Sequence, residues 1–295
     1  MKRKHPPRPH RPSDRPHPER PPRREGQAPR PPAPRRSGPT PERDLQIGSD
    51  AWIYGIHAAL AAIGNPDRTI RQIIIAQESV QELAPKVAAA RASRATACPD
   101  ATRLPRAEID RALPRAAVHQ GIAVAAAELP ALDMDDLIRS VDGRSTTRIL
   151  VLDQVTDPHN VGAILRSAAA FGVAGVVLPE RNAPGASAVM AKAASGAMER
   201  VPLIRVVNLA RALDQLKAAN IWCIGLDGDA PQTVGDSDLT GRIALVLGAE
   251  GEGLRRLTRE RCDALVRIPI AQTAVESLNV SNAAAIALYE LARRG

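Results

Sequence analysis

The second half of the sequence alternates short apolar runs with longer stretches of helical periodicity. Apolar runs of strand length occur at 149–152, 175–178, 201–206, 221–226, 243–247 and 265–268. The stretches between them, and a last one at about 280–293, have the spacing of helices. This alternation predicts an α/β fold with a mainly parallel sheet covered by helices on both faces. Because ligands of such sheets bind beyond the carboxyl ends of the strands, we expect a site in the loops that follow them.

A smaller pattern of the same kind precedes this region. Residues 52–63, 79–92 and about 106–113 have apolar positions at helical spacing, whereas 70–76 and 122–126 are apolar runs of strand length. We interpret 49–130 as a small α/β domain. Residues 131–147, with an acidic stretch at 132–142, are then a linker, and 148–295 form the larger domain.

The first 48 residues differ from both patterns. They contain 14 of the 26 prolines, 13 Lys/Arg and 5 Asp/Glu, which leaves 27 basic and 27 acidic residues in the rest of the chain. Such a segment cannot bury enough apolar surface to offset its ordering entropy, so 1–48 is predicted to be a disordered basic tail. It could add phosphate contacts on RNA or simply aid solubility. The net charge of +8 therefore describes the tail and not the folded body.

Composition excludes several classes of protein. Cys98, Cys223 and Cys262 are isolated, which favours reduced thiols in the cytoplasm and no metal site. No apolar run approaches the roughly 20 residues of a membrane span, so no membrane association is expected. Aromatic residues make up only 2% of the chain, which argues against RNA-binding modules that stack bases on aromatic platforms.

Three loops after predicted strands carry polar groups. The first, after 149–152, contains Asn160 and leads into a helix with Arg166 on its first or second turn. An ordinary helix cap would explain Asn160 equally well. The third loop, after 265–268, contains Ser277 and Asn279, and has more hydroxyl and amide side chains than one helix cap requires.

The second loop, after 243–247, is rich in glycine and acid. It begins at Gly248, contains Glu250 and Glu252, and ends in Gly253. Its glycine spacing fits neither a dinucleotide fingerprint nor a P-loop, and its carboxylates would repel a phosphate. A cofactor that has a positive charge and no phosphate, such as S-adenosylmethionine, is compatible with it. A flexible glycine-rich turn is the alternative.

Together, the stretches at 153–173, 245–270 and 276–291 resemble the SpoU-like (SPOUT) family of RNA 2′-O-ribose methyltransferases. The segment from Trp52, with Tyr54 to Ala58, also resembles the small L30e-like substrate-binding domain that precedes the catalytic domain in the ribosomal-RNA branch. The resemblance implies a deep trefoil knot, a homodimer formed through the catalytic domain, and S-adenosylmethionine as cofactor. It implies that Gly248, Ile268 and Leu278 hold the cofactor. The polar active-site positions that it implies are Asn160, Arg166, Glu250, Ser277 and Asn279.

The implied reaction is methylation of a ribose 2′-hydroxyl, most simply on a guanosine of 23S ribosomal RNA. Because a guanidinium stays protonated, we expect Arg166 to act as an electrostatic clamp and not as a base. The segment 269–276 departs from the family pattern, which leaves the path of this loop open. Two alternatives remain: methylation of transfer RNA, and an RNA-binding relative that has lost turnover.

Overall fold

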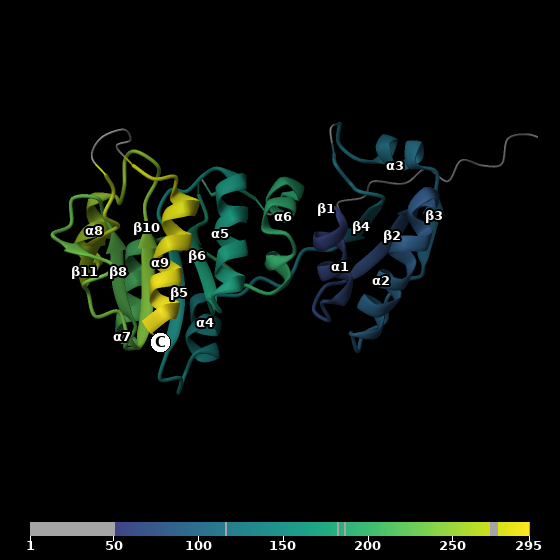
Figure 1. Cartoon of the computed structure of the whole chain (residues 1–295). Coiled ribbons are helices and arrows are strands. Elements are labelled where there is room, and N and C mark those ends of the chain that lie inside the picture. The colour runs from purple at the N-terminus through teal and green to yellow at the C-terminus, as the bar shows by residue number, and fades with distance from the viewer. Residues whose placement is uncertain (1–50, 116, 182, 186, 272–276, 295) are drawn as a thin grey trace, which may run out of the picture. The chain divides into compact units, whose positions relative to one another are not determined.

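The computed structural model describes residues 51–115, 117–181, 183–185, 187–271 and 277–294. The predicted tail at 1–48 and the loop segment at 272–276 lie outside these residues. The described chain forms two separate β-sheets, one of four strands and one of seven (Figure 1). No helix in the described ranges has the length and apolar character needed to cross a bilayer.

The four-stranded sheet is built from the residues that follow the tail. Its strand order is β1-β4-β2-β3, with β2 parallel to β3 and β4 antiparallel to β1 and β2. The strands are β1 (Ala51–Tyr54), β2 (Ile70–Ala76), β3 (Ala101–Leu104) and β4 (Ile122–Ala126). The helices of this region are α1 (Ile56–Gly64), the 3₁₀ turn η1 (Gln77–Ser79), α2 (Val80–Ala92) and α3 (Arg106–Ala112).

The expectation of one helix over 52–63 was wrong at its start. Trp52, Ile53 and Tyr54 lie in β1 and pair with β4, and α1 begins only at Ile56. Aromatic and β-branched residues favour strands, and Gly55 has a φ of 90°, which interrupts a right-handed helix. The short strand β3 was not predicted, because its sequence alternates too little to distinguish it from a loop.

The seven-stranded sheet confirms the predicted parallel architecture. Its order is β7-β6-β5-β10-β8-β11-β9, and all neighbouring strands are parallel. The strands are β5 (Thr147–Leu152), β6 (Gly175–Pro179), β7 (Leu203–Val206), β8 (Trp222–Leu226), β9 (Gln232–Thr233), β10 (Arg242–Leu247) and β11 (Ala264–Arg267). The helices are α4 (Met134–Ser140), α5 (Pro158–Ala170), α6 (Ala188–Ala194), α7 (Leu209–Ala218), α8 (Arg256–Arg261) and α9 (Val280–Arg294), with the 3₁₀ turn η2 (Ala197–Glu199).

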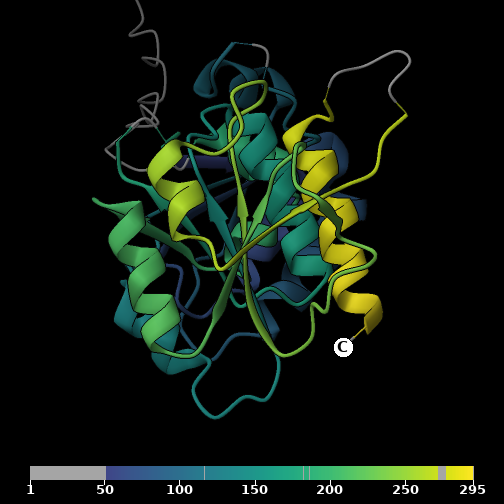
Figure 2. The same ribbon diagram turned by 90° about the vertical axis from the view of Figure 1, so that its left-hand side faces the viewer.

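Helices cover this sheet on both faces, as Figure 2 shows. One face packs on α5, α6 and α9 through residues such as Val161, Met190 and Ala284. The opposite face packs on α4 and α7 through Met134 and Leu213. Because each central strand has buried residues on both sides, its sequence is a continuous apolar run and not an alternating one.

The stretch expected to be a linker, 131–147, contributes to this core. It contains α4, which Asp133 caps by accepting from the Asp136 N–H at 2.8 Å. Met134, Leu137 and Val141 are buried in the same cluster as Ile149. The acidic residues occupy the cap and the exposed face of the helix, so the acidic composition concealed a helical amphipathic pattern.

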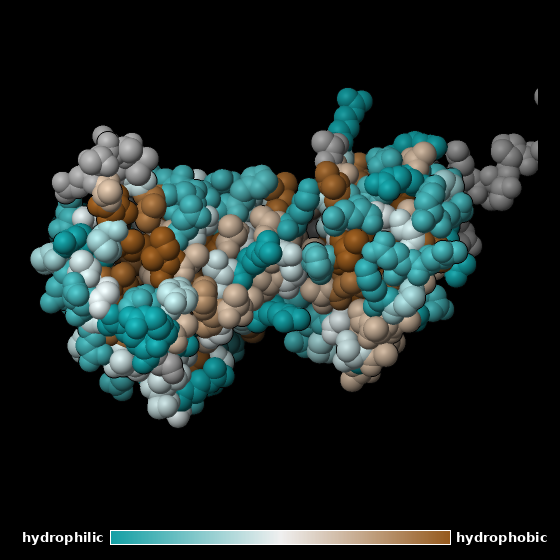
Figure 3. All heavy atoms as spheres, viewed as in Figure 1, coloured by the Kyte–Doolittle hydropathy of each residue, from teal (hydrophilic) through white to brown (hydrophobic). Residues whose placement is uncertain are grey.

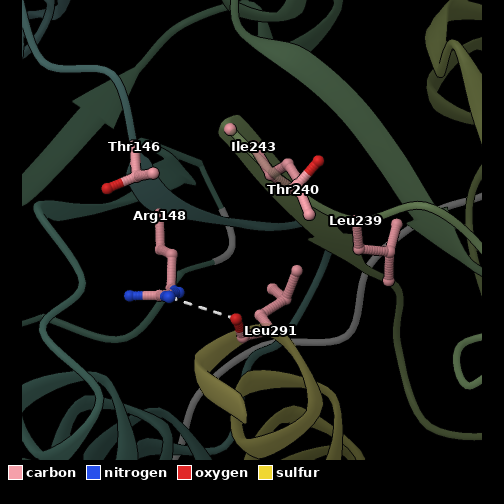
Figure 4. Close-up of a pocket in the computed structure, with 7 residues that line it drawn as sticks. Thr146, Arg148, Leu239, Thr240, Ile243 and Leu291 are labelled. Atoms are coloured by element: carbon pink, nitrogen blue, oxygen red, sulfur yellow. Dashed lines mark hydrogen bonds between the residues drawn. The ribbon is translucent and has the colours of Figure 1, made fainter. Parts of the chain in front are cut away.

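The last helix is fixed beside the centre of the sheet. Near its end, the Leu291 carbonyl accepts a hydrogen bond of 3.1 Å from Arg148 Nη2 on β5 (Figure 4). Tyr289 of α9 lies edge-on to Phe171 at the end of α5, with ring centroids 6.4 Å apart. These contacts place the start of α9, and with it Asn279, at the carboxyl edge of the sheet, where the loops after β5 and β10 also lie.

Candidate active site

Three side chains from three distant loops meet at that edge. Asn160 Nδ2 donates to Glu250 Oε1 at 2.9 Å, and Asn279 Nδ2 donates to the same oxygen at 2.5 Å. Asn279 Nδ2 also lies 3.0 Å from Asn160 Oδ1. We call these three residues the exposed cluster, since Glu250 and Asn279 are exposed and Asn160 is partly so. The structure thus brings together three side chains that the sequence analysis assigned to one site.

Asn279 has two roles at once. Its Oδ1 accepts from the N–H groups of Ser281 at 2.9 Å and Asn282 at 3.4 Å, which caps the start of α9. Its amide nitrogen is thereby turned toward Glu250, whose Oε1 also accepts from the Val280 N–H at 3.3 Å. Asn279 therefore caps the helix with its amide oxygen while its amide nitrogen contacts Glu250.

The glycine-rich loop between β10 and α8 forms a tight hairpin. The N–H of Ala249 donates to the Gly253 carbonyl at 3.1 Å, and the reverse bond measures 3.0 Å. A Cβ atom on Gly248 would lie 2.1 Å from the Gly253 carbonyl carbon and oxygen, so only glycine fits there. Gly251 and Gly253 have φ values of 79° and 67°. The glycines thus fold the loop back on itself and present Glu250 at its tip.

This loop forms one wall of a cavity of about 380 Å³. Apolar side chains of Leu226, Leu247, Ile268, Ile270 and Leu278 line it beside the backbone of the loop. Gly248, Glu250, Ser277 and the apolar Ile268 and Leu278, all predicted from sequence, line this single cavity. Asn160 and Asn279 join it through their bonds to Glu250.

Acidic groups dominate the polar lining of the cavity. Asp227, Asp229, Glu250 and Glu252 contribute to it, against one cation among the described lining residues, Arg259. Arg259 is itself paired with Asp227, with Nε 3.2 Å from Oδ2. Asp227 and Asp229 follow β8 and were missed from the sequence, where an Asp-Gly-Asp turn has no distinguishing feature. The parallel topology, which puts the end of β8 beside the end of β10, was the signal that could have found them.

Arg166 lies apart from the cavity. It is the ninth residue of α5, in the third turn, because the helix begins at Pro158 and includes Asn160. The expectation of the first or second turn was therefore wrong, and Arg166 lies about 9 Å farther along the helix axis than Asn160. The guanidinium is exposed and has no hydrogen-bond or ion-pair partner among the residues that the structure describes.

The cysteines and acidic residues do not form a metal centre in the described part of the chain, where no three His, Cys, Asp or Glu side chains are grouped to bind an ion. All three cysteines are free. Burial, with a contribution from Asp263, raises the pKa of Cys223 and of Cys262 to about 12. Both sulfurs are therefore thiols and not nucleophilic thiolates at neutral pH.

Comparison with known proteins identifies the family of this chain. The sequence matches the SpoU rRNA Methylase family over residues 147–289. It is 43% identical over 246 residues to the 23S rRNA (guanosine-2′-O-)-methyltransferase RlmB of Escherichia coli strain K12, covering 82% of this chain and 98% of that protein. The chain belongs to the SpoU rRNA methylase family. The resemblance stated from the sequence is thereby confirmed.

Other members of the SpoU family are similar over the same extent. The RlmB protein of Yersinia pestis is 42% identical over 243 residues, covering 82% of this chain and 96% of its own. The SpoU methyltransferase AviRb of Streptomyces viridochromogenes, solved in complex with S-adenosylmethionine, is 25% identical with a TM-score of 0.68. That match covers 83% of this chain and 90% of AviRb. Members of the family bind S-adenosylmethionine, as predicted for this chain.

The cavity fits this cofactor. S-adenosylmethionine has a sulfonium, an ammonium and one carboxylate, and so a net positive charge and no phosphate; the cavity lining has four carboxylates and no unpaired cation among its described residues. Opposite charges at close range in a partly enclosed site attract strongly. The absence of a side chain at Gly248 lets the Gly253 backbone pack directly against it, and the compact loop backbone that results forms one wall of the cavity.

Proposed function

We propose that this protein transfers a methyl group from S-adenosylmethionine to the ribose 2′-hydroxyl of a guanosine in 23S ribosomal RNA. The observation that carries the proposal is the exposed cluster, whose Glu250 lines an acidic cavity, in a chain that aligns with RlmB proteins over 96–98% of their length. Action on ribosomal RNA in the cytoplasm is part of the proposal.

The residues divide into those that hold the cofactor and those that face the RNA. Gly248, Ile268 and Leu278 would hold the cofactor, through the loop backbone and apolar contacts in the cavity. S-adenosylmethionine supplies an electrophilic methyl group. Glu250, fixed by Asn160 and Asn279, has a second carboxylate oxygen that accepts no hydrogen bond from any described residue, so it can orient a ribose hydroxyl. Ser277 is exposed at the same wall and can add a further contact.

Arg166 is proposed to meet the RNA phosphate. Its exposed guanidinium has no partner among the described residues, which leaves its five N–H donors available. A positive charge beside the 2′-hydroxyl makes that hydroxyl more acidic, and its proton can leave to a phosphate oxygen or a water. Because the guanidinium itself stays protonated, it stabilises charge and does not act as the base.

The small α/β domain is proposed to be an L30e-like domain that binds ribosomal RNA. Four arginines, Arg103, Arg106, Arg111 and Arg115, are exposed on β3, α3 and the turn that follows. None of them forms an ion pair with another described residue, so their charges are available to phosphates.

A trefoil knot and a homodimer complete the proposal. The chain leaves β11 near one edge of the sheet and returns past Glu250 to place α9 against α5, a crossing compatible with a knot. Figure 3 shows apolar residues gathered on the face where Figure 1 places α9. On α9 itself, Ile286 is 41% exposed and Tyr289 57% exposed, which suits burial against a second copy.

A methyl-transfer assay on separated RNAs tests the proposal. Purified protein and radiolabelled S-adenosylmethionine are incubated with 23S ribosomal RNA that lacks 2′-O-methylation and, separately, with unmodified transfer RNA. We expect label in one guanosine of the 23S RNA, mapped by its resistance to alkaline hydrolysis. Labelling of transfer RNA alone would overturn the substrate. Binding of 23S RNA without transfer would support the inactive relative.

A further inference from the structure

Asp153 is the most deeply buried acidic group beside the glycine-rich loop, residues 248–254, that carries Glu250. It directly follows β5, its side chain is 0% exposed, and it does not line the cavity. A buried carboxylate is costly unless hydrogen bonds satisfy it. All the described bonds of its side chain go to one residue, Arg255, which immediately follows the loop that carries Glu250.

The contacts of Asp153 link both ends of that loop. Its backbone N–H donates to the carbonyl of Leu247, the last residue of β10, at 2.7 Å. Its Oδ2 accepts from the Arg255 N–H at 3.1 Å, and its Oδ1 accepts from Arg255 Nε at 2.7 Å. The second guanidinium nitrogen, Nη2, lies 2.7 Å from the same Oδ1. The residues on either side of the segment 248–254, Leu247 and Arg255, are therefore both hydrogen-bonded to the same aspartate.

The interior of the loop leaves little freedom once its ends are fixed. Ala249 and Gly253 bond to each other in both directions, and Gly248 touches the Gly253 backbone with no space for a Cβ. The position of the tip, where Glu250 meets Asn160 and Asn279, then depends on how firmly the two ends are held. The end at Arg255 is held by the side chain of Asp153, whereas the end at Leu247 is held by its backbone N–H.

We propose that Asp153 is a positioning residue: through Arg255, it sets the cofactor-facing backbone of 248–254 and the placement of Glu250. This inference rests on the proposed function for the identity of the substrate, but its effect on cofactor affinity does not require the RNA. Asp153 touches neither cofactor nor RNA in this assignment.

The test compares cofactor affinity and turnover in matched variants of the full chain. In Asp153→Asn, one acceptor oxygen becomes an amide that faces a donor, so we expect the dissociation constant for S-adenosylmethionine to rise about 10- to 100-fold. Binding is measured by calorimetry without RNA, and kcat and KM are then measured with 23S RNA. The KM for RNA should stay near that of wild type while the KM for the cofactor rises.

Arg255 gives a second route that does not remove a buried charge, since its side chain is 47% exposed. Arg255→Lys keeps the charge and should weaken cofactor binding less than Arg255→Ala, which loses every side-chain bond to Asp153. The control is Arg256→Ala, whose partner Glu260 lies 2.7 Å away and whose side chain is 77% exposed. It should bind cofactor as wild type does.

The outcomes separate the two proposals. If wild type binds the cofactor but methylates no 23S RNA, the proposed function fails while the role of Asp153 can still be measured by calorimetry. If folded Asp153→Asn binds within twofold of wild type, or Arg255→Ala matches Arg256→Ala, the positioning role is overturned. Should Asp153→Asn fail to fold, the Arg255 pair of variants decides alone.

Discussion

Two polar groups lie at the same edge of the seven-stranded sheet and differ in their burial and in the hydrogen bonding of their carboxylate oxygens. The Asp153–Arg255 pair has a fully buried carboxylate whose two oxygens are both occupied by protein donors. In the exposed cluster, Glu250 has one oxygen shared by Asn160 and Asn279, and another without a described donor. A carboxylate whose two oxygens both accept hydrogen bonds from the protein can only hold the chain in place. A carboxylate with one oxygen that lacks such a donor can also bind a ligand. This comparison separates residues that build the site from residues that act in it.

The largest effect is expected at Arg166, whose side chain has no partner among the described residues. Arg166→Ala should lower kcat by about 10²–10³-fold or more, because it removes charge stabilisation needed only as the hydroxyl ionises. Cofactor affinity, measured by calorimetry, should stay near that of wild type, since Arg166 does not line the cavity. Wild-type turnover in this variant would contradict the assignment. Arg166→Lys, which keeps charge but loses the planar fork, should fall between the two.

Gly248→Ala tests the loop without removing any polar group. The new Cβ would lie 2.1 Å from the Gly253 backbone, so the hairpin must open. Overpacking of this kind costs about 1–3 kcal/mol, which corresponds to a loss of cofactor affinity of about 5- to 150-fold if the loop bears the strain. Gly185→Ala is the control, because a Cβ there meets nothing within 4 Å. Equal cofactor affinity in both variants would show that the loop does not form the binding wall.

Glu250→Gln tests the exposed cluster itself. The amide keeps one acceptor oxygen for Asn160 and Asn279 but loses the negative charge, so the cluster should persist with weaker bonds. We expect kcat to fall about tenfold and the melting temperature to change little, since the group is exposed. The measurement is steady-state kinetics beside thermal unfolding. A large loss of stability with unchanged kcat would place Glu250 among the structural residues with Asp153.

The smallest expected effect is a pH dependence of stability caused by the thiols of Cys223 and Cys262. Burial raises the pKa of Cys223 and Cys262 to about 12, whereas a thiol in an unfolded chain ionises near pH 8.5. Between these values the unfolded state has lost protons that the folded state keeps, so stability falls as pH rises from about 8.5 toward 12. Urea unfolding at a series of alkaline pH values checks this. In the double variant Cys223→Ala, Cys262→Ala, the free energy of unfolding should depend less steeply on pH.

The sequence predicted the residues of the exposed cluster but not those that support it. The alternation of strands and helices indicated the loops after the strands, and the resemblance to the SpoU-like family then singled out Asn160, Glu250 and Asn279 within them. Asp153 also follows a strand directly, but its function depends on Arg255, 102 residues away, and no local pattern encodes that pairing. Asp227 was hidden for the same reason, since its place in the cavity depends on the neighbouring strand.

Two predicted helices have a first residue that differs from the observed one. The helix predicted from residue 52 begins after Gly55, because Trp52 and Tyr54 belong to a strand whose partner, β4, lies far along the chain. The turn that carries Arg166 was misplaced because Asp157 and Pro158 start α5 earlier than the loop motif suggests. In both cases a helix was correctly predicted, but its first residue was not.

The bond between Asn160 and Asn279 joins residues 119 positions apart. Closing a loop of that length costs about 4 kcal/mol of chain entropy before the contact contributes anything. Contacts of this kind also slow folding, because β5, β10 and α9 must all be placed before the three side chains can meet. The ability to bind cofactor should consequently appear late in refolding, after most of the helical signal has returned, which makes cofactor binding a kinetic marker for completion of this sheet.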